Sequence, residues 1–191
     1  VDDLDQGHYP QFYHRISGVR APHNVFSATT TLKAAKQKDV NLPQAVGFKF
    51  QPETPVASRP ASAQKVTINF SYPQYQVEYV YEPSTNRYLR YNGGAPHLDA
   101  NTKQQLAPKN IIIVYAPTAP IAGTPLLDVN LNGSGRALIL KEGTVTEGSW
   151  EKPDFASPIQ FKDQNGAEVK LVPGQVWLEI VTLTTPVNIS Q

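Results

Sequence analysis

Proline and glycine are spaced so densely through this chain that long regular elements are excluded over most of its length. The sequence has 17 prolines and 12 glycines in 191 residues. Both residue types interrupt helices and mark turns. Between these breaks, apolar and polar residues alternate, as in "KVTINFSY" at 65–72 and "YQVEYVYE" at 75–82. Alternation of this kind is typical of half-buried strands. We therefore predict an α+β fold that is mostly antiparallel β, with one short helix near the N-terminus followed by a β-rich domain.

One stretch has the pattern of a helix. The sequence "ATTTLKAAKQK" at 28–38 places Ala28, Leu32 and Ala35 on one helical face. Ser27, directly before it, is a residue type that caps helix N-termini. Because the apolar stripe is thin, we expect this helix to need a larger surface to pack against.

Four patterns describe the expected β-rich domain in more detail. The apolar run "NIIIVYA" at 110–116 predicts a central strand. "NGG" at 92–94 and Asn165-Gly166 predict tight turns, the second of them in a hairpin. "NGSG" at 132–135 predicts a glycine-rich turn between two strands. It lacks the Gly-x-Ser-x-Gly spacing of a hydrolase nucleophile and the Lys-Ser or Lys-Thr pair of a phosphate loop.

Composition divides the chain into four parts. Residues 1–50 are polar and aromatic, with little periodicity outside the predicted helix and a short strand at "VGFKF". Residues 51–64, "QPETPVASRPASAQ", are rich in proline, alanine and serine, which predicts a linker. Residues 65–184 are predicted to form the β-rich domain, and 185–191 a short tail.

Composition also disfavours several classes of function. The net charge is +1 and the basic residues are scattered, so no nucleic-acid partner is predicted. The chain has no cysteine, which excludes disulfides and thiolate chemistry within it. No signal peptide and no apolar run of membrane-spanning length is present. Because methionine is also absent, we expect a processed product or a fragment.

The tripeptide Ala-Pro-His occurs at 21–23 and again at 95–97, and holds two of the four histidines. The stiff backbone around proline suits a positioned binding or proton-transfer group, and equally an ordinary loop. At the first copy, Arg20, His23 and Asn24 could hold an anion at the N-terminus of the predicted helix. Alternatively, His23 and Asn24 satisfy backbone groups of the loop.

The second copy belongs to a cluster of Arg90, His97 and Asp99. His97 and Asp99 are two residues apart, so in an extended segment they face the same side, where the carboxylate could orient the imidazole or share a metal. Alternatively, Asp99 closes an Asx turn in "DANT". A metal site would need a third ligand from elsewhere, such as His23, so neither a metal nor a cofactor is predicted.

Trp150 and Trp177 are the only tryptophans, and each lies in a predicted strand among apolar neighbours. Core packing is the default interpretation. The alternative is an aromatic platform for sugar rings, which outward-facing tyrosines could extend. The candidates for that extension are Tyr72, Tyr75, Tyr79, Tyr81, Tyr88 and Tyr91.

Four longer motifs carry a family resemblance. In order they are "RAPHNVF", "YLRYNGGAPHLDANTKQQLAPKNIIIVY", "GSGRALILKEGTVTEGSWEK" and "FKDQNGAEVKLVPGQVWLEIV". Together they resemble the YerB-like family of bacterial lipoproteins, which is defined by a domain of unknown function. The resemblance extends from Tyr9 to about Val181. It is most specific in "PHLDANTKQQLAPKNIII" and in "GSWEK…NG…PGQVWLEI".

The resemblance implies an exported protein anchored by lipid to the outer face of the bacterial cytoplasmic membrane. It also implies an N-terminal mixed α/β domain followed by a C-terminal β-rich domain. Residues 1–50 would then be the tail of the N-terminal domain, with most of that domain and the lipid-bearing cysteine expected before Val1. The family has no biochemical activity that can be carried over.

The leading hypothesis is therefore an extracytoplasmic binding or interaction module. Its expected partners are the missing N-terminal half of the same protein and a cell-wall component or envelope protein, and it would contact the membrane only through a lipid anchor absent from this chain. The alternative is a cell-envelope hydrolase or transferase with His23 or His97 as general base and Arg20 or Arg90 stabilising an anion. A structural or assembly role is a third possibility.

Overall fold

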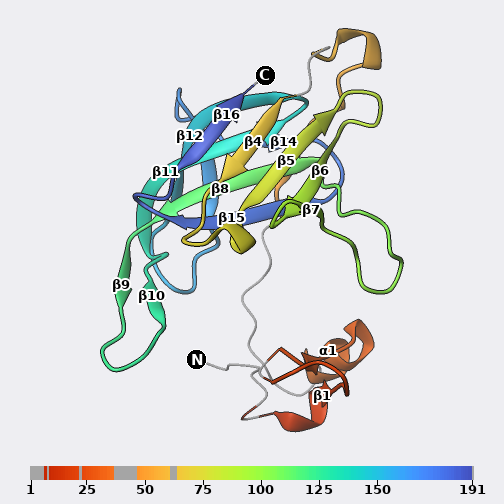
Figure 1. The fold of residues 1–191 in the computed structure, drawn as a ribbon. Coiled ribbons are helices and arrows are strands. Elements are labelled where there is room, and N and C mark those ends of the chain that lie inside the picture. The colour runs from red at the N-terminus through yellow and green to blue at the C-terminus, as the bar shows by residue number, and fades with distance from the viewer. Residues whose placement is uncertain (1–6, 8, 22, 37–46, 61–63, 191) are drawn as a thin grey trace. The chain divides into compact units, whose positions relative to one another are not determined.

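The computed structural model describes residues 7, 9–21, 23–36, 47–60 and 64–190. The chain divides into two compact units, Val1–Ala45 and Val46–Gln191 (Figure 1).

The first unit contains short elements only. They are the 3-10 helix η1 (Pro10–Phe12), the antiparallel strands β1 (His14–Arg15) and β2 (Val25–Phe26), and the helix α1 (Thr29–Lys36). The hydroxyl of Ser27, predicted to cap the helix, donates instead to the carbonyl oxygen of Phe12 at 2.8 Å and so ties the start of α1 to η1. Within the described ranges, no helix is long and apolar enough to cross a lipid bilayer.

The second unit is built from two five-stranded sheets that face each other (Figure 1). One sheet has the order β13-β12-β11-β8-β15, and the other the order β16-β4-β5-β6-β7. Pairing within both sheets is antiparallel except between β8 and β15. The strands of the first sheet are β8 (Asn110–Ala116), β11 (Gly133–Lys141), β12 (Thr144–Lys152), β13 (Gln160–Asp163) and β15 (Val176–Thr182). Those of the second are β4 (Lys65–Ile68), β5 (Val77–Glu82), β6 (Arg87–Asn92), β7 (Ala95–Pro96) and β16 (Val187–Ser190).

Smaller elements flank the sandwich. The strands β9 (Thr118–Pro120) and β10 (Leu127–Val129) form an antiparallel ribbon that extends from one end of the sheets (Figure 1). The strands β3 (Lys49–Phe50) and β14 (Lys170–Leu171) form a short parallel pair. Two 3-10 helices complete the unit, η2 (Val56–Ser58) and η3 (Pro73–Tyr75). The β-rich fold class is therefore confirmed.

The main hydrophobic core lies between the two sheets. Alternate residues of β5 are buried there, as the sequence pattern predicts, and they meet alternate residues of β8 and β11 from the facing sheet. Every residue of β8 is buried, because its other face contacts a second cluster that includes Trp150 and Phe161. The prediction of a central strand at 110–116 is thus confirmed.

Both predicted tight turns are present. Gly93 and Gly94 join β6 to β7 with φ of 57° and 80°, values that a two-residue hairpin turn of this kind requires. In the later hairpin, the amide of Gly166 donates to the carbonyl of Asp163, and the Asp163 carboxylate accepts from the amides of Asn165 and Ala167. The local turn chemistry of these segments therefore decides their structure.

The "NGSG" segment differs from the prediction. Gly133, Ser134 and Gly135 are the first residues of strand β11 rather than a turn. Gly135 lies opposite Trp150 on β12, and a Cβ atom at Gly135 would come within 2.6 Å of the indole nitrogen. Glycine is present here because the indole packs against the strand, donating to the carbonyl of Tyr115 at 2.9 Å.

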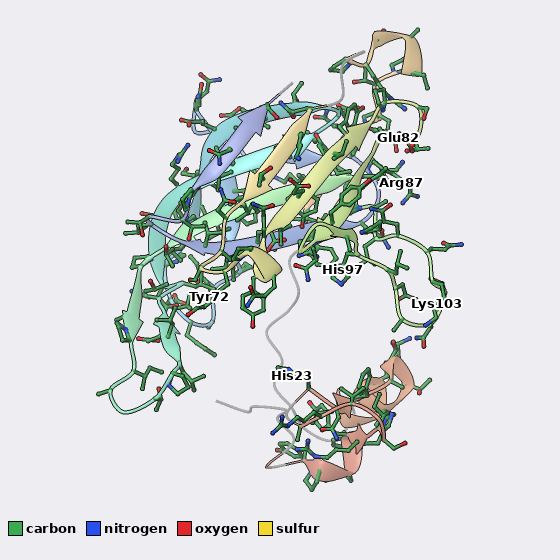
Figure 2. The ribbon with its side chains drawn as sticks, in the orientation of Figure 1. His23, Tyr72, Glu82, Arg87, His97 and Lys103 are labelled. Atoms are coloured by element: carbon green, nitrogen blue, oxygen red, sulfur yellow. The ribbon has the colours of Figure 1, made fainter. Side chains whose placement is uncertain are left out.

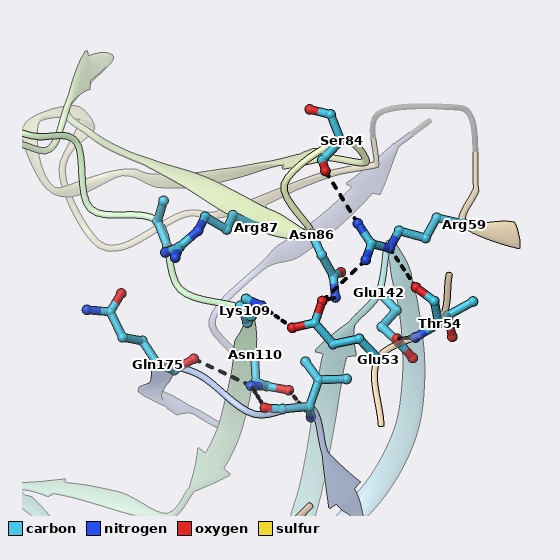
Figure 3. A network of polar contacts seen from close by, with 12 residues as sticks. Glu53, Thr54, Arg59, Ser84, Asn86, Arg87, Lys109, Asn110, Glu142 and Gln175 are labelled. Carbon is cyan, nitrogen blue, oxygen red and sulfur yellow. Dashed lines mark hydrogen bonds and ion pairs between the residues drawn. The ribbon is translucent and has the colours of Figure 1, made fainter. Parts of the chain in front are cut away.

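The predicted linker also differs from expectation, because Glu53, Thr54 and Arg59 bond to residues of the second unit (Figure 3). Glu53 accepts hydrogen bonds from Lys109, Arg59 and Asn86, and the bond from Lys109 is the main cause that lowers the pKa of Glu53. The amide of Thr54 donates to Glu142. Residues 51–60 thus form a strap over the second unit, and the boundary between the two units falls at Ala45/Val46.

The predicted tail is likewise part of the fold. Residues 187–190 form β16, an outer strand that pairs with β4. Val187 packs against the main core, and its alternation with Asn188 is the same period-2 pattern that predicts the other strands. The pattern is too short in this segment to be separated from a loop by sequence alone.

Candidate functional site

Arg90 and Glu179 are the two charged residues that are buried in the described part of the chain. Alternation along β6 turns Tyr88 and Arg90 inward, and alternation along β15 turns Glu179 inward from the facing sheet. The two side chains meet between the sheets, with Arg90 Nη2 3.2 Å from Glu179 Oε1. Each charge is thereby neutralised where little water reaches it.

Hydrogen bonds close this pair into a four-residue network. Tyr79, directly opposite Arg90 on β5, accepts from Arg90 Nε at 3.0 Å and donates to Glu179 Oε1 at 2.6 Å. Arg90 Nη1 donates to Nδ1 of His97, which follows strand β7. Trp177 lies against the guanidinium at 4.5 Å from its ring centroid, and 6.2 Å from the imidazole centroid. We call Tyr79, Arg90, His97 and Glu179 the inner cluster.

The surroundings set the protonation of the inner cluster. Burial and the positive charge of Arg90 lower the pKa of His97, against an opposing effect of Glu179. The imidazole is therefore neutral and accepts at Nδ1 near neutral pH. Burial, with the nearby Glu179 carboxylate, raises the pKa of Tyr79 far above its usual value, so the phenol keeps its proton. The cluster is suited to joining the two sheets, because Tyr79 and Arg90 of one sheet bond to Glu179 of the other.

The structure brings together two of the three residues predicted for this cluster. Arg90 and His97 are in contact, but the Asp99 carboxylate is bound elsewhere. Asp99 Oδ1 accepts from the amide of Thr102 at 2.7 Å and from its hydroxyl at 2.9 Å. These bonds lower the pKa of Asp99. The Asx-turn alternative is thus the correct interpretation, and the idea that Asp99 orients His97 is wrong.

At the first Ala-Pro-His segment, the described residues bond to one another within the loop. Asn24 accepts from Arg15 at 2.6 Å and donates to the carbonyl of Ile16 at 3.4 Å. The amide of His23 donates to the carbonyl of Arg20, which closes a turn, and both side chains are exposed. Asn24 therefore follows the backbone-satisfying alternative. Pro22 lies outside the described residues, and His23 and His97 belong to different units.

Neither tryptophan is an open platform. Trp150 is 1% exposed and belongs to the second core. Trp177 is half-buried and stacks with Arg90. Among the six candidate tyrosines, Tyr79, Tyr81 and Tyr88 are buried, whereas Tyr72 and Tyr75 are 60% and 56% exposed. Of the candidate tyrosines, the two at η3 are therefore the ones with largely exposed rings.

An open groove of about 370 Å³ lies where the ends of both sheets meet the β9–β10 ribbon. One side is formed by Thr118 and by Leu127 and Val129 of the ribbon. The remainder comes from the end of β15 with its following loop, and from residues 69–71, which follow β4. The amide of Asn69 donates to the carbonyl of Pro186 at 3.0 Å, which joins these two loops.

The lining of the groove is uncharged throughout. Its residues are Asn69, Phe70, Ser71, Thr118, Leu127, Val129, Ile180, Val181, Thr182, Thr184, Thr185 and Pro186. Sequence reasoning did not select these residues, since they carry no motif. Their only sequence signal is a gathering of hydroxyl side chains at the ends of strands β4 and β15, as in "NFSY" and "TLTTP". In the described residues, no group of three or more His, Cys, Asp or Glu side chains could hold a metal ion.

Sandwich modules of this kind, with a groove among the loops at one end, are binding scaffolds in many unrelated proteins. Residues 66–178, more than half of this chain, match the family described as "Protein of unknown function (DUF3048) C-terminal domain". The chain therefore belongs to that family.

Two comparisons extend the match beyond the family domain. The chain is 28% identical over 181 residues to "Putative lipoprotein YerB" of Bacillus subtilis (strain 168), covering 94% of this chain and 54% of that protein. A crystal structure of YerB protein from Bacillus subtilis superposes with a TM-score of 0.73 at 26% identity, covering 94% of this chain and 60% of that one. The resemblance to YerB-like proteins is confirmed, and the chain spans about half the length of this curated relative.

Proposed function

We propose that this chain is a non-catalytic binding module of a bacterial lipoprotein that acts outside the cytoplasmic membrane. The observation that carries the proposal is the groove, which is concave, open, and lined from both sheets by uncharged polar and apolar side chains. Binding sites combine apolar walls with a few placed polar groups in this way. A general acid or base, by contrast, must be a titratable group within reach of the reacting atoms, and the lining contains no such group.

The inner cluster argues against the hydrolase or transferase alternative. A general base must offer an unprotonated nitrogen to the substrate. In His97 that nitrogen is Nδ1, which already accepts from Arg90. An anion stabiliser must present its donors outward, and Arg90 directs its guanidinium to Tyr79, His97 and Glu179. The contacts of these residues stabilise the fold, which leaves the groove as the stronger candidate for recognition.

The extracytoplasmic location rests on the relative whose name describes it as a lipoprotein. We extend this location, with its lipid anchor, to the protein that contains the present chain. The ligand would then be a cell-wall component or an envelope protein. The relative is about twice as long as the matched part, which suggests that the protein has a second half. That half would be a further partner of this chain.

Co-sedimentation tests the proposal. Wild-type protein is incubated with insoluble cell-wall sacculi and, separately, with membrane vesicles that carry envelope proteins. We expect retention by one of the two, and loss of retention for Thr118→Arg, which places a bulky charge in the groove. Gln104→Arg is the matched control, because it adds the same charge at an exposed position outside the groove lining. Retention that Thr118→Arg leaves unchanged, or absence of retention on both materials, would contradict the proposal.

A further inference from the structure

Three polar side chains in the groove have hydrogen-bonding capacity that no described residue uses. The hydroxyls of Ser71 and Thr118 have no partner among the described residues, and the amide nitrogen of Asn69 donates to none of them. The carbonyl oxygen of Asn69 is engaged, since it accepts from Gln76 at 2.7 Å. This bond fixes the amide plane, so that the Asn69 amino group is held in place as a donor.

Two exposed tyrosines continue directly from this polar patch. Tyr72 follows Ser71 in the chain, and it lies at the same end of the sandwich as the β9–β10 ribbon (Figure 2). Its ring contacts that of Tyr75 edge-on, with centroids 6.2 Å apart and planes at 75°. Both rings are largely exposed, at 60% and 56%, and together they form an aromatic pair that is open to a ligand.

The backbone under the tyrosines is held rigidly. Tyr72 directly precedes the 3-10 helix η3, and Tyr75 is its last residue. Pro73 restricts the first position of this helix, and the amide of Tyr75 donates to the carbonyl of Tyr72 at 2.9 Å. The amide of Gly93 donates to the carbonyl of Gln76, which pins the segment to the β6–β7 turn. A Cβ atom at Gly93 would lie 2.9 Å from the carbonyl oxygen of Gln74, so only glycine permits this approach. Rings held in this manner lose little freedom on binding.

We infer that the groove and the Tyr72–Tyr75 pair bind an uncharged oligosaccharide. This inference rests on the proposed function and specifies the ligand of the same groove. The C–H faces of a sugar ring stack on aromatic rings, and its hydroxyls both donate and accept. They are therefore matched by the Ser71 and Thr118 hydroxyls and by the Asn69 amino group.

Other ligand chemistries fit the groove less well. A phosphate or carboxylate would lose water without gaining a positive partner, because the lining contains no lysine, arginine or histidine. A purely apolar segment would cover Asn69, Ser71 and Thr118 and leave their polar groups unsatisfied, at a cost for each group. A neutral polyhydroxylated chain avoids both penalties.

The test is a titration of isotope-labelled protein with cellotetraose, chitotetraose and maltotetraose, monitored by NMR of the backbone amides. Tetragalacturonate is the charged counterpart. We expect at least one neutral tetrasaccharide to shift the amides of residues 69–72, 74–75 and 182–185, with a Kd on the order of 1 mM. Tyr72→Ala and Tyr75→Ala should each weaken that binding roughly 5–10-fold. Phe155→Ala is the control, because Phe155 is an exposed ring, 69% accessible, outside the groove lining.

Three outcomes would overturn the inference. They are the absence of shifts with all neutral tetrasaccharides, equal or tighter binding of tetragalacturonate, and shifts that the two tyrosine substitutions leave unchanged. An uncharged Thr-Val hexapeptide with blocked ends is titrated in parallel. If only the peptide shifts the groove amides, the oligosaccharide is excluded while the binding function of the groove stands. If groove-dependent retention also fails in co-sedimentation, the binding function is contradicted too.

Discussion

The inner cluster and the groove use polar side chains in opposite ways. The inner cluster contains full charges, it is buried, and its guanidinium, carboxylate, phenol and imidazole are bonded to one another. The groove has no charge, it is open, and several of its hydrogen-bonding groups have no partner among the described residues. Arg90 and His97, which the sequence suggests as reactive residues, are thus engaged in contacts that stabilise the fold. The Ser, Thr and Asn side chains of the groove, which carry no motif, keep groups that are available to a ligand.

The first prediction should give the largest effect. Glu179→Ala removes the carboxylate that neutralises Arg90 and leaves an unpaired charge between the sheets. We expect a loss of about 3–5 kcal/mol in the free energy of unfolding, measured by denaturant titration. Glu147→Ala removes the partner of Arg136 at the surface, where both side chains are at least half exposed, and should cost at most about 1 kcal/mol. Equal losses of unfolding free energy for the two variants would show that the buried inner cluster stabilises the fold no more than a surface ion pair does.

The second prediction concerns the shared phenol. Tyr79→Phe deletes a hydroxyl that donates to Glu179 and accepts from Arg90, without changing the ring that packs in the core. The expected loss is about 1–3 kcal/mol in the same measurement. Tyr91→Phe is the matched control, since the Tyr91 hydroxyl makes no hydrogen bond to the described residues, and it should change stability by less than about 0.5 kcal/mol.

The third prediction uses the lowered pKa of His97. Because the folded state takes up this proton less readily than the unfolded chain does, the contribution of His97 to stability is present above its unfolded pKa and is lost as pH falls below it. The free energy of unfolding should therefore decrease from pH 7.5 to pH 5.5 more steeply for the wild type than for His97→Gln. Identical slopes for wild type and His97→Gln would show that burial and Arg90 do not hold the imidazole neutral.

The fourth prediction has the smallest effect on stability and tests the groove side of the comparison. Thr118→Val should change the free energy of unfolding by less than about 0.5 kcal/mol, because no described residue bonds its hydroxyl. Thr185→Val, in the same groove, should cost about 1 kcal/mol, since Oγ1 of Thr185 accepts from the amide of Thr182 at 3.1 Å. A large loss for Thr118→Val would mean that its hydroxyl serves the fold and not a ligand.

Local patterns account for the parts of the fold that the sequence predicts correctly. The alternation in β5, the apolar run of β8 and the turn at Gly93-Gly94 depend on neighbours a few residues away. The same holds for Asp99, whose Asx turn is closed by Thr102. These features could be predicted because the physics that produces them acts within one short segment.

Long-range contacts account for what could not be predicted. Glu179 reaches Arg90 across 89 positions of sequence, so no spacing rule could have added it to the cluster. The polar composition of residues 51–64 is the same whether the segment is solvated or bound, and only the position of Lys109 and Asn86 in the fold decides that Glu53 is held. The groove arises from the meeting of loops that follow β4, β8 and β15, which is a property of the strand order.

The strap at 51–60 and the late strands β15 and β16 bear on how fragments of such proteins are designed. The segment that family similarity recognises ends at Leu178, one residue before Glu179 and in the middle of β15. A fragment cut at those limits would keep Arg90 in the interior without its carboxylate and would lack Val181, a member of the main core. Expression trials should therefore begin upstream of Gly47 and extend to Ser190, because the family domain at 66–178 is shorter than the unit that folds.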